Sequence, residues 1–175
     1  MTSSVLDGST GTEEAPMASV RTGIGFDAHR FGGPGPVILC GVSIEHATGV
    51  EATSDGDVAS HAICDALLGS AALEDMGSHF PSDDPQWHGA SSIDMVARCA
   101  GMVYDRGLEI SHIDVSIVAQ DVRIAPFRDQ MRQNLATAVR IPFAQVSVKA
   151  TTTDGLGWIG AGEGLAAYAV ATVVR

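Results

Sequence analysis

The sequence predicts one α/β (α+β) domain, in which a mixed β-sheet is covered by helices on one face. Segments with the two-residue alternation of strands and segments with helical spacing follow each other in the order β-β-α-α-β-α-β-β. The chain has 175 residues, of which 45% are apolar, so it can bury one hydrophobic core. Residues 165–174 form a last strand that is apolar on both faces. Either this strand is central, or helices cover one face of the sheet and another subunit covers the other.

The first half of the domain is expected to contain two strands and a helix. Residues 21–30 and 37–46 have strand composition, and the Gly- and Pro-rich residues 31–36 between them predict a turn. Residues 55–73 are predicted to form a helix, because their apolar residues recur at helical spacing behind a start rich in Asp and Gly.

The second half alternates between helices and strands. The expected elements are a loop over residues 77–90, a helix from a cap at Ser91 or Ser92 to Gly107, a strand over residues 110–119, a helix over residues 126–139 and a strand over residues 146–150. Residues 1–19 are rich in Ser, Thr, Gly, Glu and Pro, which predicts a disordered extension or a cloning remnant. The domain is therefore expected to span residues 20–175.

The charge of the chain excludes several classes of function. The formal net charge is −11 and Lys149 is the only lysine, which argues against nucleic-acid binding. No apolar run reaches the roughly 18 residues that a membrane span needs, and no leader pattern precedes the domain, so we expect a cytoplasmic protein without membrane contact. Cys40, Cys64 and Cys99 are expected to be buried thiols.

Three residues form a candidate metal site. Asp27 and His29 lie two apart on a predicted strand, so their side chains point to the same face, and His61 lies on the next predicted helix. One carboxylate and two imidazoles are typical of a catalytic zinc site, which keeps its fourth position open. The alternative to a metal site is that the Asp-x-His pattern occurs by chance and that His61 is simply packed in the core.

Other residues on the same predicted helix have several possible roles. Cys64 and Asp65 share a helix face with His61, and each is a candidate for an alternative ligand or for a partner that orients the imidazole. Asp57 is a further candidate partner, but Asp55 and Asp57 are equally well explained as residues that cap the helix. His46, His79, His88 and His112 are expected to be solvated.

Two loops are candidate substrate sites. The three hydroxyls of Thr151, Thr152 and Thr153 follow a predicted strand and suit a phosphate cradle, and Asp154 suits a cation such as Mg²⁺. An ordinary Thr-rich turn is the alternative. The acidic residues 74–85 can accept hydrogen bonds from a polyol, or they can simply be a solvated loop.

Five motifs together carry a resemblance to a known family. They are G-F-D-A-H-R-F-G-G, S-D-G-D-V-A-S-H-A-I-C-D-A-L-L-G, E-D-M-G-S-H-F-P, K-A-T-T-T-D-G-L-G and G-E-G-L-A-A, in this order over residues 21–175. In sequence and spacing they resemble the 2-C-methyl-D-erythritol 2,4-cyclodiphosphate synthase family. The resemblance implies a homotrimer with its sheets around the threefold axis, each subunit having a mixed four-stranded sheet and a small N-terminal hairpin.

The resemblance also implies an activity. The family converts 4-diphosphocytidyl-2-C-methyl-D-erythritol 2-phosphate into the cyclic diphosphate and CMP, in the non-mevalonate route to isoprenoids. It does so at sites between neighbouring subunits, with Zn²⁺ or a similar ion and with Mg²⁺ or Mn²⁺ on the substrate diphosphate. Three hypotheses of function remain. Two are enzymes, this cyclase and a metal phosphohydrolase, and the third is a non-catalytic metal- or nucleotide-binding trimer.

Site residues follow from the resemblance position by position. The implied zinc ligands are Asp27, His29 and His61, and Asp154 is the implied ligand of the second ion. Thr53 and Thr152 are the implied catalytic residues. The implied substrate contacts are Asp27, Ala28, His29, Thr53, Ser54, Asp75, Met76, Gly77, Phe80, Pro81, Ser82, Asp83, Asp84, Thr151, Thr152, Thr153 and Asp154. The segment expected to recognise cytosine is Ala119, Gln120, Asp121, Val122, Arg123, Ile124 and Ala125.

The chain departs from the family pattern at four positions. Many relatives have His at position 53, where that side chain has a transition-state role, and Asp is frequent at position 82. Many also have Arg at position 161, where this chain has Ala161; in those relatives the arginine faces the central cavity of the trimer and is associated with isoprenoid diphosphates. Trp158 replaces a smaller residue there, and Trp158 and Ala161 are counted among the implied substrate contacts. Trp158 can still bury an apolar isoprenoid tail, but Ala161 offers its diphosphate no arginine, so we expect weak or absent binding of isoprenoid diphosphates.

Overall fold

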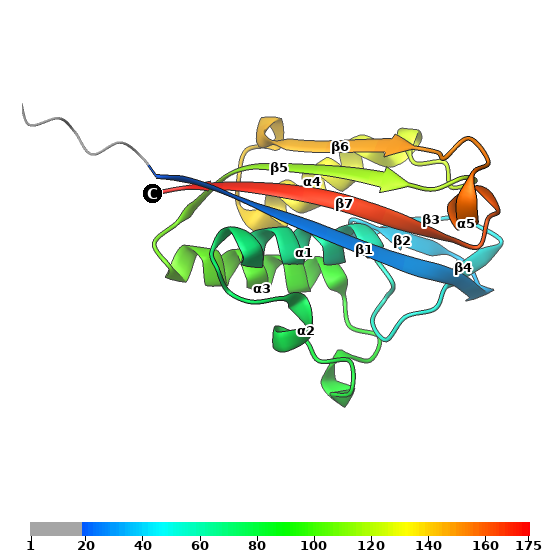
Figure 1. Cartoon of the computed structure of the whole chain (residues 1–175), viewed down its shortest axis with the longest axis horizontal. Coiled ribbons are helices and arrows are strands. Elements are labelled where there is room, and N and C mark those ends of the chain that lie inside the picture. The colour runs from blue at the N-terminus through cyan, green and yellow to red at the C-terminus, as the bar shows by residue number, and fades with distance from the viewer. Residues whose placement is uncertain (1–18) are drawn as a thin grey trace, which may run out of the picture.

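A five-stranded mixed sheet forms the centre of the molecule, with the strand order β4-β1-β7-β5-β6 (Figure 1). The structure is a computed structural model and describes residues 19–175, so the predicted extension over residues 1–19 lies outside the described residues except for Ser19. The strands of this sheet are β1 (Val20–Pro34), β4 (Thr48–Val50), β5 (Glu109–Val118), β6 (Val146–Thr151) and β7 (Gly164–Val174). The sheet is mixed because β5 and β6 are parallel while the other pairs are antiparallel.

The last strand, β7, is central and is covered by helices on one face. It pairs with β1 on one side and with β5 on the other. The residues that β7 turns toward the helices are Leu165, Ala167, Ala169, Ala171 and Val173, and all are buried. Three helices cover this face: α1 (Val58–Ser70), α3 (Ser92–Asp105) and α4 (Arg128–Val139). The predicted mixed α/β fold with helices on one face is therefore confirmed.

The opposite face of the sheet exposes large apolar side chains in the single chain. Ile24 is 71% exposed, and the rings of Phe26 and Tyr168, whose centroids are 4.7 Å apart, are about half exposed. These residues alternate along β1 and β7 with residues that face the helices. In these strands, neighbouring side chains therefore serve opposite faces.

Two glycines let α1 approach β1 very closely. A Cβ at Gly25 would lie 1.9 Å from the carbonyl oxygen of Ala62, and a Cβ at Gly23 would lie 2.0 Å from that of Ala66. Both contacts involve helix backbone, which cannot move aside as a flexible side chain can. The approach brings the N-terminal half of α1 against β1, where Asp27 and His29 continue the same strand face.

The predicted single strand over residues 37–46 is wrong. This segment is a separate hairpin of β2 (Val37–Leu39) and β3 (Val42–Ile44), which turns at Cys40 and Gly41. Both turn residues have positive φ, 48° and 70°, a conformation that two-residue hairpin turns require. Cysteine is not a usual residue there, so the composition does not reveal the turn.

The predicted count of four strands is one short. The short strand β4 pairs with the end of β1, which runs four residues beyond its predicted end. Three further short elements lie in predicted loops: α2 (Met76–His79), the 3₁₀ turn Pro85–Trp87 and α5 (Gly157–Gly160). Two more 3₁₀ turns, Ala125–Phe127 and Phe143–Gln145, flank α4. Such short elements have too few residues to show a period.

The N-terminal caps decide where two of the helices begin. The side chain of Asp57 accepts the Ser60 N–H, so α1 begins at Val58 rather than at residue 55, and the capping interpretation of Asp57 is confirmed. Ser91 caps α3 in the same way, through the Asp94 N–H. In the described part of the chain, the helices are all too short or too polar to cross a membrane.

We predict that Gly25→Ala strongly destabilises the fold. The added methyl group meets the Ala62 carbonyl at 1.9 Å, and overpacking of this kind costs about 1–3 kcal/mol or more. Gly101→Ala is the matched control, because the same methyl at Gly101 in α3 has no atom within 4 Å and should stabilise the helix by roughly 0.5–1 kcal/mol. Urea unfolding at one fixed protein concentration measures the stability of each variant. Equal unfolding midpoints for the two variants would refute the close-approach argument.

Candidate active site

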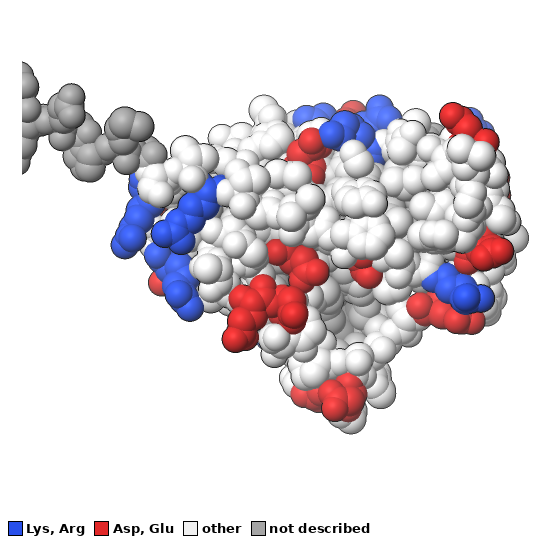
Figure 2. All heavy atoms as spheres, viewed as in Figure 1, with Lys and Arg blue, Asp and Glu red and all other residues white. Residues whose placement is uncertain are grey.

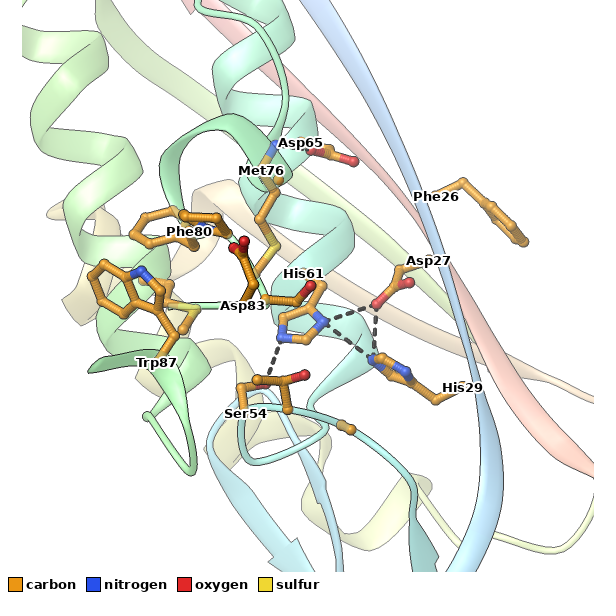
Figure 3. A pocket seen from close by; sticks show the side chains of 16 residues that line it. Phe26, Asp27, His29, Ser54, His61, Asp65, Met76, Phe80, Asp83 and Trp87 are labelled. Atoms are coloured by element: carbon orange, nitrogen blue, oxygen red, sulfur yellow. Dashed lines mark hydrogen bonds and ion pairs between the residues drawn. The ribbon is translucent and has the colours of Figure 1, made fainter. Parts of the chain in front are cut away.

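The three predicted metal ligands meet at one point between β1 and α1. Asp27 and His29 come from the face of β1 that packs on the helices, and His61 comes from the first turn of α1 (Figure 3). Asp27 Oδ2 lies 3.0 Å from His29 Nε2 and 2.9 Å from His61 Nδ1, and the two nitrogens are 3.1 Å apart. The sequence prediction that these three side chains come together is confirmed.

This arrangement fits a divalent cation. Zinc bonds to nitrogen and oxygen are about 2.0–2.2 Å long, which puts tetrahedral ligand atoms roughly 3.4 Å apart. The observed separations of 2.9–3.1 Å need only a small expansion to reach that geometry. Each residue offers one ligand atom, all three are partly buried, and the set leaves a fourth position for another ligand.

Asp27 is held in its ionised form. Burial raises the pKa of its carboxyl group, but hydrogen bonds and charge from His29 and His61 outweigh burial and lower the pKa well below the usual value. Its second oxygen accepts the Ala28 N–H at 2.8 Å. The carboxylate is therefore ready to bind a cation at neutral pH, without first losing a proton.

The other polar residues of α1 have different partners. Asp65 accepts the Met76 N–H at 2.7 Å. Cys64 is fully buried, and burial raises the pKa of its thiol well above the usual value. Asp57 is also fully buried and accepts the Gly41 N–H at 2.8 Å, which ties the turn of the β2–β3 hairpin to α1. None of the three belongs to the cluster of ligand atoms.

A cavity of about 440 Å³ opens beside the three ligands. The predicted substrate residues that line it, besides the ligands themselves, are Thr53, Ser54, Met76, Gly77, Phe80, Pro81, Ser82 and Asp83. Two other predicted contacts cap short helical turns instead: Asp75 accepts the Ser78 N–H and Asp84 accepts the Gln86 N–H. The acidic loop therefore contributes one wall of the cavity.

Part of this wall is apolar, and the sequence analysis missed some of it. Trp87 and Met95 line the cavity together with Met76 and Phe80. The rings of Phe80 and Trp87 pack edge to face, with centroids 4.9 Å apart (Figure 3). Trp87 was detectable as a large aromatic in a polar loop, whereas Met95 was one of several apolar residues of α3.

The remaining predicted substrate residues lie elsewhere in the same chain. A second cavity, of about 340 Å³, forms where the parallel strands β5 and β6 end. The predicted residues lining it are Ala119, Gln120, Val122, Arg123, Ile124, Ala125, Thr151 and Thr152. Among the described residues, no part of segments 119–125 or 151–154 lines the cavity beside the metal cluster.

The loop around Asp154 has an unusual backbone. Asp154 has a φ of 53°, and its N–H donates to Thr152 Oγ1 at 3.2 Å. The Thr152 hydroxyl in turn donates to the Asp154 carboxylate at 3.3 Å. A positive φ at a residue other than glycine is strained and clusters at functional sites. The two side chains of this loop that are predicted to act on the substrate are thus held side by side.

Trp158 lines a smaller hollow beside residues 28–30 of β1. Its other lining residues are Ala28, His29, Arg30 and Glu163, and its volume is about 170 Å³. Ala161 is exposed and ends α5 nearby, and Asp121 lies beside Glu45 in another shallow cavity. The predicted site residues that line cavities in one chain therefore lie at four cavities, two of which share Arg123.

Figure 2 shows the charges on one face of the molecule. Acidic side chains lie near the middle, at the bottom and at the right-hand end of this face, and basic ones gather at the left-hand end and along the upper edge. In the described residues the single lysine, Lys149, is engaged by Asp114 at 2.6 Å. Among the described residues, neither lysine nor arginine lines the cavity beside the metal cluster.

Comparison with known proteins identifies close relatives of this chain. A family model described as the YgbB family matches residues 20–174. A protein of Pseudoalteromonas atlantica named 2-C-methyl-D-erythritol 2,4-cyclodiphosphate synthase is 48% identical over 152 residues, which are 87% of this chain and 94% of that protein. A protein of Novosphingobium aromaticivorans named bifunctional enzyme IspD/IspF is 50% identical over 163 residues, which are 93% of this chain but 42% of that protein.

Solved structures agree with the sequence relatives. The bifunctional IspDF of Campylobacter jejuni superimposes with a TM-score of 0.88 at 36% identity, over 91% of this chain and 43% of that one. IspF of Plasmodium falciparum, solved as a CDP complex, superimposes with a TM-score of 0.78 at 28% identity, over 89% of this chain and 96% of that one. The chain thus spans less than half of the bifunctional proteins and nearly all of the others. Since the family model covers almost every described residue and the relatives align over most of the chain, this protein belongs to the YgbB family.

Proposed function

We propose that the protein converts 4-diphosphocytidyl-2-C-methyl-D-erythritol 2-phosphate into 2-C-methyl-D-erythritol 2,4-cyclodiphosphate and CMP, in the non-mevalonate route to isoprenoids. The observation that carries the proposal is the Asp27, His29 and His61 cluster at the wall of a cavity. The chain that holds it is 46–48% identical, over 87–90% of its length, to proteins named for this reaction.

The reaction is an intramolecular phosphoryl transfer. An oxygen of the 2-phosphate attacks the β-phosphorus, a new P–O bond forms, and the bond from that phosphorus to the oxygen of CMP breaks. CMP leaves with the bonding electron pair as a phosphate oxygen. The attacking phosphate is already ionised near pH 7, so the protein needs no general base. What it must supply is alignment and neutralisation of charge.

The residues beside the cavity suit these two tasks. Asp27, His29 and His61 would hold Zn²⁺ or a similar divalent ion. Such an ion supplies a positive charge that neutralises phosphate oxygens and polarises the phosphorus under attack. Ser54 and Thr53 line the same cavity, so the Ser54 hydroxyl can donate a hydrogen bond to the reacting phosphate. Thr53 has no imidazole, so it would contact the reacting phosphate only through its backbone N–H and its short hydroxyl side chain.

The second cavity suits the nucleotide half of the substrate. We assign the cytosine to residues 119–125 and the diphosphate to the Thr151–Asp154 loop, where Asp154 would hold Mg²⁺ or Mn²⁺ together with substrate oxygens. The strained backbone at Asp154 and its contacts with Thr152 support a preformed loop. The P. falciparum relative was solved with CDP, which supports a cytidine nucleotide as the ligand.

We further propose that the protein is a homotrimer with active sites between subunits. Two observations support this. The metal cavity contains no residue of the Thr151–Asp154 loop of its own chain, which favours a second copy as the source of that loop. The sheet face opposite the helices exposes Ile24, Phe26 and Tyr168, and burying such a face is favourable at about 25 cal/mol per Å². Trp158 and Ala161 would then face the centre of the trimer.

Product analysis tests the reaction. With the cytidine diphosphate substrate, Zn²⁺ and Mg²⁺, we expect the cyclic diphosphate and CMP in equal amounts, measured by phosphorus NMR and mass spectrometry. The cyclic product forms because both reacting groups belong to one molecule. Linear phosphates in its place would identify a metal phosphohydrolase, and no turnover would favour a binding protein.

The metal assignment makes a separate prediction. His61→Ala removes one of three ligands, so the purified variant should lose bound zinc, measured by elemental analysis. Loss of a ligand or of its orienting partner lowers metal affinity by about 10–100-fold or more. His88→Ala is the control, because His88 is exposed in a loop and does not belong to the cluster. Full zinc occupancy in the His61→Ala protein would show that the assignment is wrong.

The shared-site proposal predicts complementation between two inactive variants. His61→Ala damages the metal half of the site, and Asp154→Ala damages the nucleotide half. When the two are co-expressed, random trimers should regain about a quarter of the parental activity, because each site draws its halves from different subunits. Light scattering should report three subunits. If the mixed protein has no more activity than either variant alone, both halves belong to the same chain.

A further inference from the structure

The second ring nitrogen of His61, Nε2, contacts two serine side chains, one at the cavity wall and one buried behind it. His61 Nδ1 faces Asp27 and His29, while Nε2 lies 2.9 Å from Ser92 Oγ and 3.0 Å from Ser54 Oγ (Figure 3 shows the Ser54 contact). Ser92 is fully buried and does not line the cavity. It lies 31 residues from His61, at the start of α3. Ser92 is not among the proposed substrate contacts.

Ser92 is itself held by a carboxylate. Its backbone N–H donates to Asp55 Oδ2 at 3.0 Å, and its hydroxyl makes a short hydrogen bond to Asp55 Oδ1. Both contacts come from one carboxylate to one residue, so the serine side chain cannot rotate without losing a charge-assisted bond. Asp55 Oδ1 also accepts the Asp57 N–H at 3.2 Å.

The two segments that carry these groups are joined by their backbones. The Asp55 N–H donates to the Ala90 carbonyl at 3.1 Å, and the Gly89 N–H donates to the Thr53 carbonyl at 2.8 Å. These bonds fix the residues before α1 to the residues before α3, and the two helices pack on each other. The support behind His61 is therefore built on two helix starts rather than on a free loop.

The direction of the hydrogen bonds follows from counting protons. A serine hydroxyl has one proton, and a carboxylate has none and can only accept. The Ser92 proton therefore points to Asp55, and Ser92 Oγ has its lone pairs directed to His61. The imidazole must then carry its proton on Nε2, which leaves the lone pair on Nδ1, the nitrogen that faces Asp27 and His29. That is the tautomer that binds a metal through Nδ1.

We propose that Ser92, held by Asp55, is a positioning residue of the metal centre. It accepts the His61 Nε2 proton and so aims the Nδ1 lone pair at the cation. The proposal rests on the proposed function, since it assumes that His61 is a ligand. Ser54 has a different role although it is equally near, because it lines the cavity and is partly exposed, so its hydroxyl is free to turn to a phosphate.

Zinc affinity of Ser92→Ala tests the proposal. The full-length variant is titrated with zinc against a competing chelator at one pH. We expect about 10–100-fold weaker binding, the usual effect of removing a partner that orients a ligand. Ser70→Ala is the matched control: Ser70 is a buried serine in α1, its hydroxyl donates to the Leu67 carbonyl at 2.7 Å, and it has no contact with the cluster. Its zinc affinity should equal that of the parent.

Two further measurements separate positioning from a general loss of structure. Thermal unfolding of the metal-free proteins should show both variants folded, with Ser92→Ala somewhat less stable than Ser70→Ala, because its lost hydroxyl bonds a carboxylate rather than a neutral carbonyl. The visible spectrum of the Co²⁺-loaded protein reports the ligand geometry, and it should change in Ser92→Ala alone. Asp55→Asn keeps one acceptor for the Ser92 hydroxyl but loses the charge, so its zinc affinity should fall between those of the parent and Ser92→Ala.

The outcomes are distinct. If Ser92→Ala binds zinc as tightly as the parent while His61→Ala does not, the positioning role is refuted and the metal site stands. If His61→Ala also binds zinc like the parent, the ligand assignment fails and the positioning role fails with it. An unchanged Co²⁺ spectrum in Ser92→Ala would likewise refute the proposal.

Discussion

The close approach of α1 to β1 is the contact on which the rest of the structure depends. Gly23 and Gly25 have no side chains, so the carbonyl groups of Ala62 and Ala66 lie where Cβ atoms would otherwise be. His61 precedes Ala62 directly, and Asp27 follows Gly25 by two residues on the same strand face. The helix–strand contact therefore sets the separation of the metal ligands, and the pocket wall from α2 to Trp87 is arranged around them.

Long periodic elements were predictable from the sequence, and short ones were not. The three main helices and most of the long strands show clear spacing, and the last strand is a continuous apolar run, so each was located to within a few residues. The strand β4 has three residues including Gly49, and it forms only because the end of β1 is available to pair with it. The turn at Cys40 and Gly41 is similarly set by a tertiary contact, the bond from the Gly41 N–H to the buried Asp57.

The predictability of the site follows the same division. Strand alternation put Asp27 and His29 on one face, and His61 on the next predicted helix completed the candidate set. The resemblance to a family then supported it, so the cluster was expected before its geometry was known. The partners of His61 were not readable, because Asp55 and Ser92 are 37 residues apart and both resemble ordinary helix caps. The sequence also could not predict that the site residues of one chain lie in separate cavities, because residue patterns say nothing of the distances between loops.

The alternation of β1 has a consequence for how this strand can vary. Ile24 and Phe26 face the uncovered side of the sheet, while Gly25, Asp27 and His29 face the helices. Inserting or deleting a single residue just before Ile24 would exchange the two sets. Apolar side chains would then collide with α1, and the metal ligands would turn outward onto the apolar surface. Both faces of this strand depend on the same alternation of residues. Its length is therefore as constrained as its composition.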